Sequence, residues 1–193
     1  MGEAQPIEPQ VRAGLVQQSL ATVRGLRAEV RDTALGGVSP RLLAAVEAAP
    51  QKDWLPLASD LALLDGLVAA VGADGMRSTW RASMLENFRR PPLGPVLHVA
   101  ERRFGRSPEG FVRFAPEAFQ AVFREAGRLE IAGASERAAT LRYEGAPAIA
   151  LASDGLLEAL AATFEAGIAF GGAAGEAAIA HDEGRVVFEL CWR

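Results

Sequence analysis

Lysine and cysteine each occur once in this chain of 193 residues, as Lys52 and Cys191, and histidine occurs twice, as His98 and His181. A phosphate-binding P-loop needs a lysine between glycine and Ser or Thr, and the neighbours of Lys52 do not match. A single cysteine excludes an internal disulfide and fits a reducing compartment. Structural zinc sites use clusters of cysteine and histidine, so we expect no metal site and no cofactor.

Long apolar runs and an excess of positive charge are missing as well. The longest uncharged stretch covers only residues 13–23, whereas a membrane-spanning helix needs about 20 apolar residues. The N-terminal MGEAQPIEPQ has no apolar h-region, so it is not typical of a signal peptide. The formal net charge is −4, which lacks the positive field that drives nucleic-acid binding. We therefore expect a cytoplasmic protein without a membrane or nucleic-acid partner.

Helix signals dominate the first two thirds of the chain. Ser39 before Pro40 predicts a capped helix start, and Pro50 predicts its end. Residues 11–31 combine strand and helix features, and we expect residues 1–10 to be a disordered leader. Apolar spacing predicts further helices over residues 57–71 (closed by Gly72), 75–89 and 95–104, with two more helix starts at residues 107–108 and 115–117, the last helix ending at Gly127.

The hydrophobic period changes after residue 127. Residues 128–131 and 139–143 alternate as strands do, and Asp154 is the expected N-cap of a helical pattern that ends at Gly167. The sequence Asp182-Glu183-Gly184 predicts a hairpin between residues 174–181 and 185–193. In the final strand, the apolar residues of one face are Val186, Phe188, Leu190 and Trp192. Helices followed by strand–strand–helix–strand–strand predict an α+β fold with an antiparallel sheet, in one domain over residues 11–193.

Motifs for catalysis are missing from this chain. A Cys–His pair needs contact at about 3 Å, whereas the expected hairpin separates His181 from Cys191 by more than about 10 Å. The glycine-rich residues 171–175 follow a helix and precede a strand, which is the reverse of the Rossmann order. One enzyme alternative stays open: Glu101 or Asp60 could act as a carboxylate catalyst with an arginine clamp in a cleft. It requires paired acids on a buried face and a perturbed pKa.

The middle third concentrates arginines and aromatic residues. Clustered guanidinium groups bind phosphates, carboxylates or acidic partner surfaces, although they also form ordinary solvated helix faces. The candidate interaction surface consists of Arg89, Arg90, Arg102, Arg103 and Arg106. Aromatic residues either line a pocket between helices and sheet or simply form the core. The candidate pocket residues are Trp80, Phe88, His98 and Phe104. His98 is either a structural residue or a haem ligand.

Several segments together resemble an uncharacterised myxobacterial paralogous domain family. They are VRAGLVQQSLATVR, KDWLPLASDLALLDGLVAAVG, MRSTWRASM and the closing HDEGRVVFELCWR. That family is in turn similar to 4-vinyl reductase and haem-NO-binding sensory domains, which hold small ligands between helices and sheet. The resemblance implies their fold and a sensory or scaffolding role. The Tyr-x-Ser-x-Arg haem-propionate motif of haem-NO sensors is absent, so the resemblance supplies no catalytic residue.

These observations predict a non-enzymatic bacterial domain for regulation, sensing or scaffolding. Its expected partner is either a small apolar ligand or a protein, and homodimerisation through the sheet edge or the terminal strand stays open. Two alternatives remain beside this reading. One is the carboxylate enzyme with an arginine clamp, and the other is a haem-binding sensor that uses His98.

Overall fold

The computed structural model describes residues 8–88, 93–182 and 185–193, apart from the side chains of residues 93, 95 and 96. The helices are α1 (Ala13–Arg24), α2 (Ala28–Leu35), α3 (Pro40–Ala48), α4 (Leu57–Asn87), α5 (Leu93–Phe104), α6 (Pro108–Val122), α7 (Ala148–Leu151) and α8 (Asp154–Phe170). The strands are β1 (Gln10–Arg12), β2 (Trp54–Pro56), β3 (Phe123–Arg124), β4 (Arg128–Ala134), β5 (Ala138–Glu144), β6 (Gly175–Asp182) and β7 (Arg185–Trp192). The predicted order of helices followed by β–β–α–β–β is confirmed, and the fold class is α+β.

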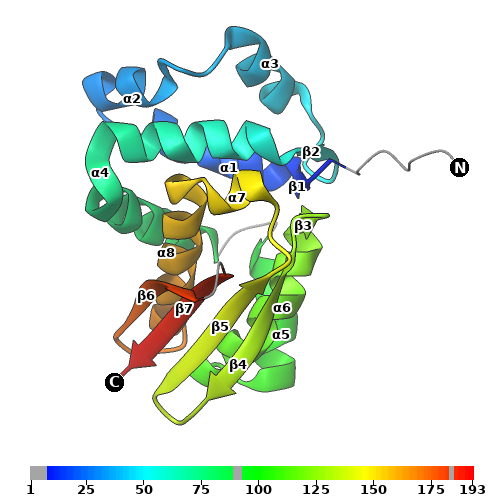
Figure 1. The fold of residues 1–193 in the computed structure, drawn as a ribbon, viewed down its shortest axis with the longest axis vertical. Coiled ribbons are helices and arrows are strands. Elements are labelled where there is room, and N and C mark those ends of the chain that lie inside the picture. Colours follow the sequence, from blue (N-terminus) through cyan, green and yellow to red (C-terminus); the bar gives the residue numbers. More distant parts are fainter. Residues whose placement is uncertain (1–7, 89–92, 183–184) are drawn as a thin grey trace, which may run out of the picture.

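Local signals place several helix ends where the sequence predicts them. The Ser39 hydroxyl accepts a hydrogen bond from the Leu42 amide, and Pro40 occupies the first helical position of α3. In α4, Gly72 adopts φ 74° and ψ 171°, so the helical path breaks there and turns before it resumes. A residue with a side chain rarely adopts that conformation, which explains why glycine divides the two halves. Figure 1 shows the second half descending toward the four-stranded sheet.

Four expected boundaries are wrong, and one of them is the helix end at Gly127, because α6 ends at Val122 and Phe123 begins β3. Pro116 does not start a helix but lies inside α6, which begins at Pro108 behind the Ser107 cap. Its ring removes one amide donor, a loss that the packed helix tolerates. Helix α8 is capped by Ser153 rather than by Asp154, since the Ser153 hydroxyl accepts from the Leu156 amide. It also continues past Gly167 to Phe170.

A small sheet in the order β2–β1–β3 joins three distant parts of the chain. Strand β1 pairs antiparallel with both neighbours, so Val11 lies opposite Leu55 on one side and Phe123 on the other. Two or three residues per strand carry no readable alternation, which is why the sequence does not predict this sheet. It fixes the start of α1 beside the start of α4 and the end of α6.

The main sheet is antiparallel in the order β4–β5–β7–β6. The predicted inward face of β7 is confirmed, because Val186, Phe188, Leu190 and Trp192 are all buried. Two helices cover this face. The ring of Phe164 in α8 packs edge-on against Phe188 at 5.1 Å, and that of Phe119 in α6 packs against Tyr143 at 5.4 Å. Figure 1 shows α1, α2, α3 and the first half of α4 at the end of the molecule opposite this sheet.

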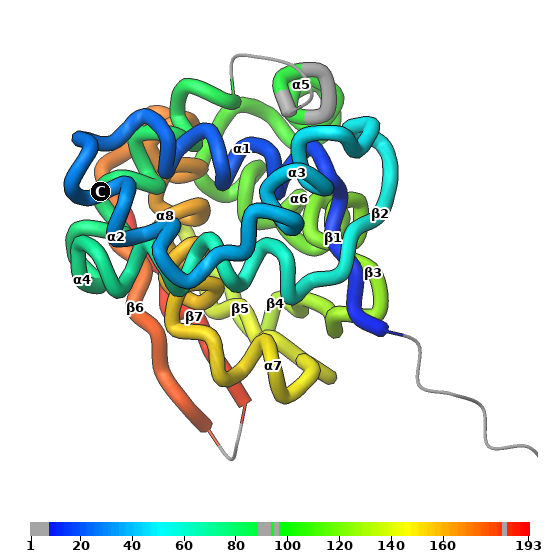
Figure 2. Tube along the Cα trace, turned by 90° about the horizontal axis from the view of Figure 1, so that it is seen from above, coloured from blue at the N-terminus to red at the C-terminus, as the bar shows by residue number. Residues whose placement is uncertain are grey.

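Helix α8 runs through the interior between α4 and the sheet, as Figure 1 shows, and Figure 2 shows α8 from above. Nearly all of its faces are buried, not only the predicted stripe. Glycine allows the close approach: a Cβ at Gly155 would lie 2.5 Å from the backbone nitrogen of Asp65 in α4. Asp65 also accepts hydrogen bonds from the Ser153 hydroxyl (2.6 Å) and the Gly155 amide (2.9 Å). Helix α4 thereby caps the N-terminus of α8.

A buried ionic cluster connects the same two helices to the sheet edge. The Arg77 guanidinium in α4 pairs with Glu158 at 2.7 Å and with Glu165 at 3.4 Å, both in α8. It also donates to the Ala177 carbonyl in β6, and Glu165 accepts from the Ala177 amide. A half-buried charge with several partners fixes geometry more than it adds stability. Within the described ranges, no helix is long and apolar enough to cross a membrane.

Candidate functional site: an apolar cavity among the helices

A cavity of about 460 Å³ lies in the interior of the fold. Its walls come from α1, α4, α6 and α8, with contributions from the ends of the small sheet and from the start of β4. This volume falls in the range that holds a drug-sized molecule. A packed protein core leaves few voids larger than a water molecule. The cavity is therefore a feature of the architecture and not a packing defect.

Apolar side chains form most of the cavity wall. The aromatic members of the wall are Trp80, Phe88, Phe111, Phe114, Phe119, Phe123 and Phe164. Small side chains line it where a filled core would carry larger ones, namely Ala115 and Ala118 in α6 and Ala159 in α8. Because these alanines face the void from two helices, the space between α6 and α8 stays open. Such a wall favours an apolar occupant.

A buried carboxyl group interrupts the apolar wall. Asp60, in the first turn of α4, is the only acid among the described lining residues. Its Oδ1 lies 2.5 Å from Ser19 Oγ, and Ser19 also donates to the Leu15 carbonyl at 3.2 Å. Burial raises the pKa of Asp60 to about 6, against the opposing effect of the Ser19 hydrogen bond. In its neutral form Asp60 can donate to Ser19 while Ser19 donates to Leu15.

Two further polar pairs lie in the wall, and both are satisfied internally. The Trp80 indole donates to the Thr163 hydroxyl at 3.1 Å, and Thr163 donates to the Ala159 carbonyl at 2.7 Å. The Gln18 amide donates to the sulfur of Met84 at 3.0 Å. These groups hold the rings and side chains of the wall in place. Because these polar groups are already hydrogen-bonded, they do not need a ligand as a partner.

The structure separates the four predicted pocket residues into two pairs. Trp80 and Phe88 line the cavity. His98 and Phe104 lie elsewhere on α5: the His98 side chain is 67% exposed and faces Glu101 at 3.6 Å, while Phe104 lies under the Arg103 guanidinium. Among the side chains of α5 that the structure describes, Leu97 lines the cavity. The helical spacing of the sequence does not show which face of α5 turns toward it.

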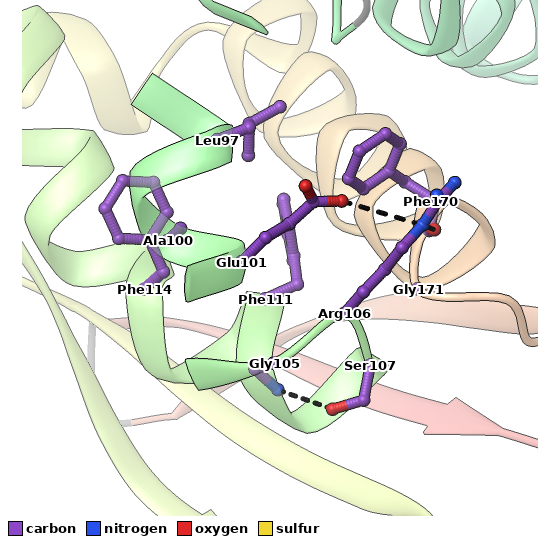
Figure 3. Close-up of a pocket in the computed structure, with 11 residues that line it drawn as sticks. Leu97, Ala100, Glu101, Gly105, Arg106, Ser107, Phe111, Phe114, Phe170 and Gly171 are labelled. Carbon is purple, nitrogen blue, oxygen red and sulfur yellow. Dashed lines mark hydrogen bonds and ion pairs between the residues drawn. The ribbon is translucent and has the colours of Figure 1, made fainter. Parts of the chain in front are cut away.

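The predicted arginine surface is only partly described. Arg89 and Arg90 lie outside the described residues. Arg102 is exposed, Arg103 pairs with Glu117 at 2.9 Å, and Arg106 lies 3.6 Å from Glu101 and over the ring of Phe170. Figure 3 shows Arg106 with Glu101 and Phe170 at a small hollow between α5, α6 and the end of α8. The volume of this hollow is about 20 Å³. That hollow is too small for a ligand, and a role of these arginines in partner binding stays a prediction.

The geometry expected of the carboxylate enzyme does not form among the described residues. Asp60 is buried with a raised pKa, as that hypothesis requires. Glu101, however, lies on α5 beside His98 and Arg106, outside the cavity wall, so the two acids do not meet. His181 and Cys191 are also apart, because His181 pairs with Val186 and Cys191 pairs with Glu176 along the hairpin. Nowhere in the described ranges do three potential metal ligands cluster.

Solved structures with the same arrangement of elements are H-NOX proteins. An Fe(II) unliganded H-NOX protein from K. algicida superposes with a TM-score of 0.63 at 11% identity, covering 94% of this chain and 96% of that one. An oxygen-binding H-NOX domain related to soluble guanylate cyclases superposes with a TM-score of 0.53 at 13% identity, covering 94% and 95%. The chain has the H-NOX fold. This likeness extends to nearly the whole chain, and it establishes the fold alone.

The predicted likeness to haem-NO-binding domains is thus confirmed at the level of fold. No protein-family model and no curated protein matches the sequence, so membership of the myxobacterial paralogous family stays a prediction.

The residues of this H-NOX fold do not fit haem. One structural neighbour is described by its haem redox potential and porphyrin distortion. Proteins hold haem iron through histidine, cysteine or tyrosine, or through methionine together with histidine. The described cavity wall contains none of the first three, and its Met84 sulfur already accepts from Gln18. His98 is exposed and the hydroxyl of Tyr143 donates to the Ala126 carbonyl.

Several cavity residues escape detection in the sequence. Ala118, Ala159 and Thr163 belong to helical stripes that resemble ordinary core positions. Arg12 and Lys52 also line the cavity, although Lys52 reads as a solvated turn lysine and Arg12 as part of an ambiguous segment. The one available signal is the run of small residues on otherwise apolar helix faces. It indicates close packing as readily as a void.

Proposed function

We propose that this chain is a non-enzymatic sensory domain that binds a small apolar molecule in the cavity. The observation that carries the proposal is the 460 Å³ volume walled by aromatic and small side chains, with its internal polar groups already paired. Burial of an apolar molecule there removes its surface and that of the wall from water. Catalytic groups do not converge on the wall, so binding is the activity that this geometry supports best.

The H-NOX fold supports a role in sensing, and the donor set argues against iron as the sensing element. The cavity is lined by α1 and α4 from the first part of the chain and by α6 and α8 from the later part. An occupant that contacts α1 and α4 on one side and α8 on the other can bias their relative position. Signal transmission through such a shift requires that the ligand bind one arrangement more tightly.

Replacing Ala118 with phenylalanine is expected to weaken the binding of a neutral apolar probe. Ala118 lines the cavity from α6, and a ring at this position fills space that the probe needs. Isothermal titration calorimetry with 1-decanol should show binding to the natural chain and a loss of about tenfold or more in Ala118→Phe.

The matched control is Ala69→Phe, which adds the same ring at an exposed position of α4. It should bind 1-decanol as the natural chain does. Absence of 1-decanol binding to the natural chain, or equal affinity in both variants, would contradict the proposed function.

A further inference from the structure

One part of the described cavity wall is exposed to solvent. Among its described lining residues, those with exposed side chains are Gln51, Lys52 and Ala121. Gln51 and Lys52 lie in the turn between α3 and β2, and Ala121 lies in the last turn of α6. The opening of the cavity therefore lies between this turn and the end of α6. We call it the mouth.

Arg12 spans the mouth. Its Nη1 donates to the Lys52 carbonyl on one side, and its Nε donates to the Ala121 carbonyl on the other at 3.3 Å. The guanidinium also stacks on the Trp54 ring, with its carbon 3.8 Å from the ring centroid. Two backbone carbonyls and an aromatic ring thus hold a positive charge at the mouth of the apolar cavity.

This charge lacks an acidic partner in the described part of the chain. The half-buried Arg77, by contrast, pairs with Glu158 and Glu165. The Arg12 guanidinium contacts two backbone carbonyls and the Trp54 ring, and none of these groups neutralises its positive charge. The side of the guanidinium formed by Nη1 and Nη2 matches the two oxygens of a carboxylate. Lys52, the only lysine of the chain, adds a second positive charge at the mouth.

We infer that the ligand is an amphipathic carboxylic acid whose head group binds Arg12 and Lys52 while its apolar tail fills the cavity. This inference rests on the proposed function and specifies the ligand class of the same site. The residues inside the cavity favour a ligand whose carboxylate stays at the mouth and whose tail points inward. Asp60 is the only acid in the described wall and lies buried beside Ser19, so an inward carboxylate would meet a like charge at neutral pH. An alkyl tail meets phenylalanine and alanine instead.

A pair of probes with one tail and two head groups tests the inference. Decanoate and 1-decanol are titrated into the natural chain and into Arg12→Met, which keeps an unbranched stem and removes the charge. We expect Arg12→Met to lower the affinity for decanoate by about tenfold and to change the affinity for 1-decanol by less than about twofold. Arg102→Met, an exposed arginine of α5, is the matched control and should change neither affinity.

Arg12→Met also removes two hydrogen bonds, so Lys52→Met and added salt provide independent tests. Because the head group binds near solvent, we expect higher ionic strength and Lys52→Met each to weaken decanoate selectively. The carboxylate inference would be overturned if the affinities for both probes fell equally. It would also be overturned if neither the variants nor added salt changed the affinity for decanoate. Retained 1-decanol binding would then leave the proposed function standing, whereas loss of both probes from the natural chain would contradict the proposed function itself.

Discussion

Replacing Gly155 with alanine is expected to lower the free energy of unfolding by about 3 kcal/mol. The added Cβ would lie 2.5 Å from the Asp65 backbone nitrogen, and backbone atoms cannot turn away as a flexible side chain can. Helix α8 must then move away from α4. The shift also lengthens the hydrogen bond between the Gly155 amide and Asp65 that caps α8. Urea unfolding followed by circular dichroism measures the loss.

Gly37→Ala is the matched control for this prediction. A Cβ at Gly37 meets no atom within 4 Å, and this residue is not among the glycines with positive φ. Alanine at Gly37 should leave stability unchanged or raise it by about 0.5 kcal/mol through the unfolded state. A loss at Gly155 no larger than that at Gly37 would show that α4 and α8 are not as closely packed as the structure has them.

Replacing Asp60 with asparagine is expected to change the pH dependence of stability. The pKa of Asp60 is about 6 in the folded chain, above its unfolded value of 3.8, so the folded state holds its proton more tightly. Stability is therefore greatest below about pH 4 and falls as the pH rises to about 6, by a total of about 3 kcal/mol. Asparagine keeps the shape of the side chain and removes this titration.

The measurement compares urea unfolding of the natural chain and Asp60→Asn from pH 4 to pH 7.5. Other titrating groups cancel in the difference between the two proteins. The variant should gain about 2 kcal/mol relative to the natural chain between pH 4 and pH 7.5, with most of the change below about pH 6.5. A difference that stays constant with pH would mean that Asp60 is not a buried, desolvated acid.

Strong local signals account for the parts of the fold that the sequence predicts. Ser39–Pro40 marks a helix start because a hydroxyl cap and a fixed φ act within one turn. The apolar residues at every second position of β7 predict its buried face, because successive side chains of a strand point to opposite faces of the sheet. Pro116 misleads, since a proline typical of a helix start is tolerated within the packed helix α6.

The candidate site is harder to predict, because a cavity is created by what tertiary packing leaves unfilled. Trp80 and Phe88 can be selected as aromatic, but nothing local tells that His98 faces solvent. Arg12 gains its place at the mouth from pairing of β1 with β2 and β3, which brings residues 52 and 121 together. Such three-part pairing has no signature in a single sequence.

The most direct test of the central claim is a crystal structure of the chain grown with 10-bromodecanoic acid. The anomalous signal of bromine locates the tail independently of the surrounding atoms. The account predicts a bromine peak inside the cavity, between α6 and α8, and carboxylate density at Arg12. Bromine found only on the outer surface, or a cavity closed by its own side chains, would contradict the claim that this fold contains a binding site for a small apolar molecule.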